Sequence, residues 1–160
     1  MFDTVLIAGL GLMGGSMAKT IKARTLSRVL GWNRTRATAE QALADGSIDA
    51  IATEALYKEA DLVIIGLYPQ ATVEWLLENM PKMKKGCVIV DMVGVKQFMV
   101  DHLEQAALDA GVHYVGGHPM AGREFSGLDF ALPTLFDGAS MIFVPTKSST
   151  ERVQIGRAHV

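Results

Sequence analysis

Short runs of aliphatic and β-branched residues alternate along this chain with longer segments in which apolar residues recur at helical spacing. The short runs predict buried strands, and the longer segments predict amphipathic helices. We expect strands at 4–8, 28–32, 48–51, 61–67, 87–91, from 113–115 onward and at 140–144, and helices at 13–22, 35–44, 72–80 and 96–110. Strands that alternate with helices form a mainly parallel sheet with helices on both faces. The pattern therefore predicts a doubly wound α/β fold.

Composition narrows the class of protein. The chain has 160 residues, 49% of them hydrophobic, which suits one well-packed domain and is too short for two large ones. The net charge of -2 argues against general nucleic-acid binding, which needs clustered Lys and Arg. The single cysteine, Cys87, excludes an internal disulfide and a cysteine-based zinc site, and we expect no metal. The apolar segment 4–18 is broken by glycines and follows Asp3, which indicates a soluble cytoplasmic domain without signal peptide or membrane span.

A glycine motif follows the first predicted strand and precedes the first predicted helix. Its pattern is Gly9-x-Gly11-x-x-Gly14. The first glycine allows a tight turn, the second lets the backbone approach a pyrophosphate, and the third lets the helix lie close to the strand. The helix N-terminus then offers unpaired N–H groups to the anion. This context predicts a dinucleotide site of the Rossmann type, and the alternative is a glycine-rich turn without a ligand.

The end of the second predicted strand bears on the choice of dinucleotide. An NAD site usually carries Asp or Glu there, which binds the ribose 2′-hydroxyl. This chain has Asn33, Arg34 and Thr35 instead, and these side chains can bind a 2′-phosphate that a carboxylate would repel. The sequence therefore favours NADP over NAD. In the alternative, Asn33 binds the ribose of NAD and Arg34 is a solvated charge.

A second unusual segment, 116–127, reads GGHPMAGREFSG after the sixth predicted strand. In open α/β sheets, ligands bind outside the carboxyl ends of the strands. We interpret His118, held among glycines and a proline, as a general base for oxidation of a hydroxyl group. His102, in a predicted helix, and His113, at a strand start, are expected to be structural or solvated.

Three stretches together, GLGLMGGSMA, DMVGVK and GGHPMAGREFSGLDFA, resemble the prephenate/arogenate dehydrogenase family over residues 2–146. The resemblance implies a Rossmann-type nucleotide-binding domain. It also implies oxidative decarboxylation of prephenate to 4-hydroxyphenylpyruvate, or of arogenate to tyrosine, with NAD or NADP. The pyrophosphate would then be held by Gly9, Gly11, Leu12, Met13 and Gly14.

The same resemblance assigns roles in the second segment. His118 corresponds to the histidine that binds the ring hydroxyl of the substrate and helps to remove its proton. Glu124 corresponds to an acidic residue at the substrate entrance, with a solvated loop carboxylate as the alternative, and Ser126 lies in the same loop. Many family members carry a serine at the position of Gly94, so a backbone carbonyl or a water would orient His118 here. Lys96 is interpreted as a charge at a helix start.

Length is the largest departure from the family pattern. Family members continue into a helical domain that forms a homodimer and contributes to the substrate site, and that domain is absent here. We expect a dinucleotide-binding domain at 1–146, the start of a linker at 147–154, and a non-native tail at 155–160, because the sequence IGRAHV resembles translated sequencing-adapter read-through. The alternatives are a genuine C-terminus, a β-hydroxyacid dehydrogenase, which shares the GLGxMG and NRT patterns, and a non-catalytic NADP-binding module.

Overall fold

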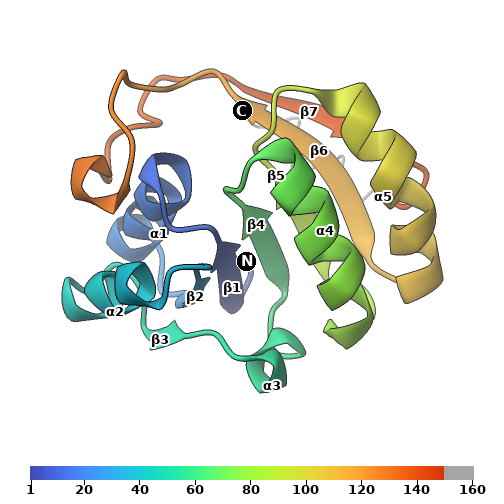
Figure 1. Ribbon diagram of the computed structural model, residues 1–160, viewed down its shortest axis with the longest axis horizontal. Coiled ribbons are helices and arrows are strands. Elements are labelled where there is room, and N and C mark those ends of the chain that lie inside the picture. The colour runs from blue at the N-terminus through green and yellow to red at the C-terminus, as the bar shows by residue number, and fades with distance from the viewer. Residues whose placement is uncertain (150–160) are drawn as a thin grey trace.

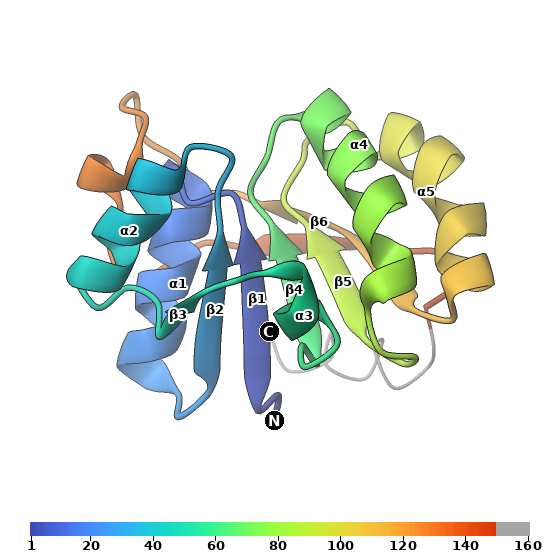
Figure 2. The same cartoon turned by 60° about the horizontal axis from the view of Figure 1, so that its bottom comes forward.

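Seven strands form a single sheet in the computed structural model, which describes residues 1–149. The spatial order is β3-β2-β1-β4-β5-β6-β7, with β1 to β6 parallel and β7 antiparallel to β6. Figure 2 shows β1, β2, β4 and β5 pointing toward the same edge. The strands are β1 (Thr4–Ala8), β2 (Arg28–Trp32), β3 (Ala50–Ile51), β4 (Leu62–Ile65), β5 (Val88–Asp91), β6 (His113–Pro119) and β7 (Met141–Pro145).

The helices connect successive strands, and their ends carry recognisable signals. Pro69 occupies the first turn of α4, where its missing N–H costs nothing. Gly111 ends α5 in the left-handed conformation, with φ of 70°, which L-residues with side chains rarely adopt. The helices are α1 (Leu12–Arg24), α2 (Arg36–Ala44), α3 (Glu54–Tyr57), α4 (Pro69–Asn79) and α5 (Lys96–Ala110), with short 3-10 helices at Met80–Lys82 and Leu128–Phe130.

Two hydrophobic cores lie on opposite faces of the sheet. Successive strand residues point to opposite faces, so Leu6 joins one core and Ile7 the other. The first core contains residues of α4 and α5, and the second contains residues of α1 and α2. Figure 1 shows these two pairs of helices on either side of the strands. The structure thus confirms the predicted doubly wound α/β fold.

Some boundaries differ from the predicted ones. β6 extends to Pro119, so it includes residues that we expected in a loop. α4 begins at Pro69, one turn earlier than predicted, and the four-residue helix α3 was not predicted. The division of the C-terminal segment at 147–154 and 155–160 stays a prediction, because residues 150–160 lie outside the described part.

The parallel arrangement brings the carboxyl ends of the strands to one edge of the sheet. Ala8 lies beside Trp32 on one side and Ile65 on the other, and Ile65 lies beside Asp91. The turns that follow these strands therefore meet at one edge, where ligands bind in open α/β sheets. None of the helices within residues 1–149 has the length and apolar composition needed to span a membrane.

Candidate functional site

The glycine motif forms a tight turn between β1 and α1. Gly9 has φ of 93°, and its N–H donates a hydrogen bond of 2.8 Å to the Trp32 carbonyl at the end of β2. A Cβ atom on Gly14 would lie only 1.7 Å from the Gly9 carbonyl oxygen. A Cβ atom on Gly9 would lie 2.7 Å from the Gly66 carbonyl oxygen, after β4. Gly9 and Gly14 are therefore required by the close approach of backbone to backbone.

Gly11 differs from its neighbours in this turn. A Cβ atom there would meet nothing within 4 Å. Glycine is therefore not needed at position 11 to avoid a collision within the protein, and it leaves open space above the backbone. Gly11 is also the N-cap of α1, and no side chain caps this end of the helix. The N–H groups of the first helical turn, from Leu12 through Gly14, have no partner inside the helix. Together these features form a cradle that fits a phosphate group at a helix N-terminus.

The residues after β2 close one side of this cradle. The Asn33 side chain accepts a hydrogen bond of 2.9 Å from the Leu10 N–H and donates one of 3.1 Å to the Thr35 carbonyl. Asn33 thus fixes the glycine turn to the end of β2. Arg34 and Thr35 are exposed, and within residues 1–149 Arg34 forms no ion pair, whereas Arg36 pairs with Glu40 at 2.8 Å.

His118 is the sixth residue of β6, opposite Ile142 of β7, and not in a loop as we expected. Gly117 precedes it, and a Cβ atom on Gly117 would lie 2.4 Å from the Asp91 carbonyl oxygen. The glycine therefore lets β6 lie close to the end of β5. His118 is half-buried, while its Nδ1 atom is buried without a hydrogen-bond partner in the described part of the chain.

Gly94 lies directly beside this imidazole. A Cβ atom on Gly94 would be 3.5 Å from the His118 Cε1 atom and 3.8 Å from Nδ1, which are ordinary contact distances. A serine hydroxyl at position 94 could therefore reach Nδ1. We expected a backbone carbonyl or a water to orient the ring, and no carbonyl within residues 1–149 bonds to Nδ1.

A buried polar network that the sequence did not reveal lies beneath the histidine. The Asp91 carboxylate is fully buried, accepts 2.8 and 2.6 Å hydrogen bonds from the Val93 N–H and the Tyr114 hydroxyl, and forms an ion pair with Lys96. Lys96 is the first residue of α5, as expected, but burial lowers the pKa of its ammonium group. Burial, followed by the charge of Asp91, raises the pKa of Tyr114 well above its usual value, so the phenol stays protonated and donates a hydrogen bond to the carboxylate. The network links β5, β6 and α5 at the carboxyl edge.

Two predicted substrate residues lie farther out. Glu124 and Ser126 belong to the exposed segment after β6, and neither forms a side-chain hydrogen bond within the described residues. The stacked rings of Phe125 and Phe130, with centroids 4.8 Å apart, hold this segment together, and the guanidinium of Arg123 lies 5.5 Å from the Phe125 ring centroid. His102 and His113 have structural contacts. The Nδ1 atom of His102 lies 2.8 Å from the Phe98 carbonyl oxygen in the same helix, and that of His113 lies 2.7 Å from the Ser148 carbonyl oxygen in the turn after β7.

Known proteins share this sequence and architecture. The chain is 36% identical to the prephenate dehydrogenase of Bacillus subtilis over 156 residues, which are 95% of this chain and 42% of that protein. It is 31% identical to the cyclohexadienyl dehydrogenase of Zymomonas mobilis over 150 residues, 90% of this chain and 50% of that protein. The crystal structure of prephenate dehydrogenase from A. aeolicus in complex with hydroxyphenyl propionate and NAD+ matches with a TM-score of 0.87 and 27% identity, covering 99% of this chain and 56% of that one.

The matched relatives are longer than this chain. The chain spans only 42–50% of the length of the two curated relatives named above. The family model that matches residues 17–158 describes the nucleotide-binding domain of prephenate dehydrogenase. This chain therefore belongs to the prephenate dehydrogenase family, as its nucleotide-binding domain.

Proposed function

We propose that this domain binds NADP, or NAD less tightly, at the carboxyl edge of its sheet. We further propose that the complete protein uses the dinucleotide for oxidative decarboxylation of prephenate or arogenate. The observation that carries both proposals is the arrangement of this edge. The open backbone at Gly11 follows β1, and the half-buried His118 is the next-to-last residue of β6, so a nucleotide site and a candidate base share one edge of one sheet.

The pyrophosphate site consists of backbone atoms. Gly11 provides the space for close approach, and the first turn of α1 provides N–H donors and the positive end of the helix dipole. Gly9 and Gly14 act indirectly, because they allow the turn to form at all. The backbone N–H groups of Leu12 and Met13 point along the helix axis toward this space.

The preference for NADP rests on the end of β2. Asn33 already bonds to the backbone of Leu10 and Thr35, so its role is to shape the turn and offer its remaining amide hydrogen. Arg34 is exposed and has no acidic partner among residues 1–149, which makes its guanidinium available for a 2′-phosphate. Thr35 adds a hydroxyl at the same place. A bidentate guanidinium–phosphate contact distinguishes NADP from NAD by charge and by geometry.

In the proposed reaction, a nicotinamide bound in the glycine cradle would supply the acceptor for the hydride that leaves the ring carbon carrying the hydroxyl group. His118 accepts the hydroxyl proton as the carbon–oxygen bond becomes a carbonyl. The bond to the ring carboxylate then breaks, carbon dioxide leaves, and the electron pair completes the aromatic ring. The proton returns to the phenolic oxygen, so no net acid or base is consumed. The Asp91–Lys96–Tyr114 network supports this step indirectly, because it ties the end of β5, which Gly94 follows, to β6, which carries His118.

Glu124 and Ser126 are proposed to bind substrate from the exposed segment that follows β6. Their exposure leaves both side chains available to a ligand. We also propose that the complete protein acts in the cytoplasm as a homodimer, with further substrate contacts from a helical domain. The family match favours this reaction over that of a β-hydroxyacid dehydrogenase.

The proposal can be tested with the complete gene product and both substrates, prephenate and arogenate, each with NADP and NAD. We expect turnover with one of the two substrates and a lower KM for NADP. Arg34→Gln should raise the KM for NADP by about tenfold or more, the effect of one charged hydrogen bond, and leave that for NAD unchanged. Binding of NADP without turnover of either substrate would identify a non-catalytic module. A clear preference for NAD in the unaltered protein would refute the cofactor assignment alone.

A further inference from the structure

The connection between β6 and β7, residues 120–140, reaches across the molecule to α1. Two strands, β4 and β5, separate β6 from β1 in the sheet. Figures 1 and 2 show the orange segment after β6 running to the side of α1 and α2 before it returns to β7. Among residues 120–140 only Leu128 and Ala131 are buried, and both belong to the core that contains residues of β1, α1 and α2. Two apolar side chains therefore anchor this connection on the nucleotide-binding side of the sheet.

Gly15 forms the surface of α1 on which this anchor rests. A Cβ atom on Gly15 would lie 2.7 Å from Leu128 Cδ1 and 3.1 Å from Ala131 Cβ. Carbon atoms pack at about 3.5–4.0 Å, so a side chain at position 15 would displace the anchor. The Gly15 N–H donates a 2.8 Å hydrogen bond to the Gly11 carbonyl, so it is not free for a phosphate. Gly15 therefore serves the β6–β7 connection and not the nucleotide cradle.

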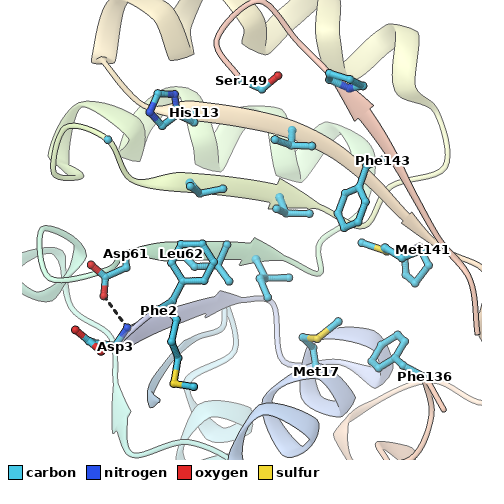
Figure 3. A pocket seen from close by; sticks show the side chains of 18 of the residues that line it. Phe2, Asp3, Met17, Asp61, Leu62, His113, Phe136, Met141, Phe143 and Ser149 are labelled. Atoms are coloured by element: carbon cyan, nitrogen blue, oxygen red, sulfur yellow. Dashed lines mark hydrogen bonds between the residues drawn. The ribbon is translucent and has the colours of Figure 1, made fainter. Parts of the chain in front are cut away.

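Further contacts extend this attachment beyond Leu128. The buried Ser16 hydroxyl accepts a 3.0 Å hydrogen bond from the Leu132 N–H. Figure 3 shows Phe136 of the connection and Met17 of α1 at the same end of an apolar groove, which both side chains line. Three more pairs join the connection to α1 and α2: Thr20 with the Pro133 carbonyl, Arg24 with Asp137, and Gln41 with Asp129. The stretch 128–137 is thus fixed to these two helices.

The stretch 120–127 is consequently held at both ends. It leaves β6 at one end and meets α1 through Leu128 at the other. Between these ends, Glu124 and Ser126 are exposed. The N-terminus of α1 also forms the phosphate cradle, so one helix determines the position of both the nucleotide site and the stretch that carries these two side chains.

We propose that Gly15 and Leu128 are positioning residues for the substrate. Their contact fixes the stretch 120–127 at the carboxyl edge, so that Glu124 and Ser126 hold the substrate with its hydroxyl-bearing carbon facing the nucleotide site. This inference rests on the proposed function, in which those two side chains bind substrate. Reactions between two bound molecules depend strongly on placement, and a displacement of about 1 Å can cost about a hundredfold in rate.

Leu128→Ala and Gly15→Ala, made in the complete gene product, test this role from both sides of the contact. Alanine is favoured over glycine within a helix, so Gly15→Ala alters the contact without weakening α1. Each variant should raise the KM for the substrate that the protein uses by about tenfold or more, with kcat within about threefold and the Kd for NADP within about twofold of the unaltered values. The matched control is Leu108→Ala, a leucine 43% exposed on α5, which should change none of these values.

The double variant shows whether the two residues act through one contact. The methyl group added at position 15 fits into the space that the Leu128 side chain leaves. The increases in KM should therefore fall short of their product in Gly15→Ala/Leu128→Ala, whereas independent effects would multiply.

Cleavage by trypsin after Arg123 gives a readout that does not depend on turnover. Arg123 is exposed within the stretch 120–127. Loss of a buried leucine side chain should favour local opening, so Leu128→Ala should speed this cleavage by at least about tenfold, and Leu108→Ala should not. Unchanged cleavage in Leu128→Ala would overturn the anchoring of the connection on α1.

The remaining outcomes separate this inference from the proposed reaction. Faster cleavage with an unchanged KM would overturn the positioning role, because Leu128 would then only stabilise the fold. A loss of NADP affinity as large as the change in KM would place Gly15 in the nucleotide cradle and overturn its assignment to the connection. Absence of turnover by the unaltered protein with prephenate and with arogenate would refute the proposed function, while the cleavage rates would still decide whether α1 anchors the connection.

Discussion

Replacement of Gly11 and of Gly14 by alanine should have opposite consequences, although the two glycines belong to one motif. A Cβ atom at position 11 meets nothing within 4 Å, and Gly11 has φ of -75°, which alanine adopts readily. Gly11→Ala should therefore change the free energy of unfolding by no more than about 1 kcal/mol, because the entropic gain of alanine opposes the preference for glycine over alanine at an N-cap. A Cβ atom at position 14 lies 1.7 Å from the Gly9 carbonyl oxygen, so Gly14→Ala should cost about 3 kcal/mol or more.

The affinity for NADP should fall in Gly11→Ala, although the stability of this variant should change little. The methyl group of Gly11→Ala occupies the space into which a pyrophosphate would approach. Loss of one backbone hydrogen bond to a charged phosphate corresponds to about 1.5–3 kcal/mol, or roughly a 10- to 100-fold weaker Kd for NADP. Urea unfolding measures the first effect and titration calorimetry the second, both on the purified domain.

Two results would refute this reasoning. If Gly11→Ala binds NADP as tightly as the unaltered domain, the open space at Gly11 is not the pyrophosphate site. If Gly14→Ala unfolds at the same urea concentration as the unaltered domain, the close contact between the turn and α1 does not constrain this position.

Three further predictions concern stability. Tyr114→Phe removes a buried 2.6 Å hydrogen bond to Asp91 and should lower the free energy of unfolding by about 1.5–3 kcal/mol, measured by thermal or urea unfolding; an unchanged midpoint would contradict this. Gly94→Ser should raise that free energy by about 1 kcal/mol by giving His118 Nδ1 a hydroxyl partner, whereas Gly94→Ala, the control, should not. The lysine partner and backbone N–H donors lower the pKa of Asp61, so its contribution to stability is present above about pH 4 and is lost as the pH falls through the lowered pKa; Asp61→Asn should make acid unfolding less steep, and an unchanged acid-unfolding curve would argue against the pairing.

The sequence predicted the parts of the fold that local patterns determine. The predicted bounds of β1, β2 and α5 agree with the structure, because aliphatic runs and a terminal glycine mark these elements. The predicted strand was shorter than β6 because Gly116 and Gly117 are unfavourable in strands. Glycine is needed at these two positions because of tertiary contacts, since side chains there would collide with Lys96 and with the Asp91 backbone.

The candidate site also has a part that local sequence patterns predict and a part that depends on contacts between distant residues. Gly9, Gly11 and Gly14 could be predicted because the motif, strand and helix are adjacent in sequence. The sequence could not show that the ion pair of Asp91 with Lys96 is buried, because its burial depends on Tyr114, 23 residues beyond Asp91. A polar residue at the end of a buried strand, followed by a lysine at a helix start, was the available signal. The use of Asn33 to hold the glycine turn also depends on a contact across 23 residues.

The most direct test of the central claim is His118→Ala in the complete protein, with turnover and NADP affinity measured side by side. General-base catalysis typically contributes about 10²- to 10⁴-fold, so kcat should fall by at least about a hundredfold. The Kd for NADP should stay within about twofold, because the nucleotide cradle lies at the other strands of the sheet and the loss is confined to a transition-state interaction. Full turnover in the variant would contradict the assignment of His118 as the base, and a parallel loss of NADP binding would contradict the separation of the two sites.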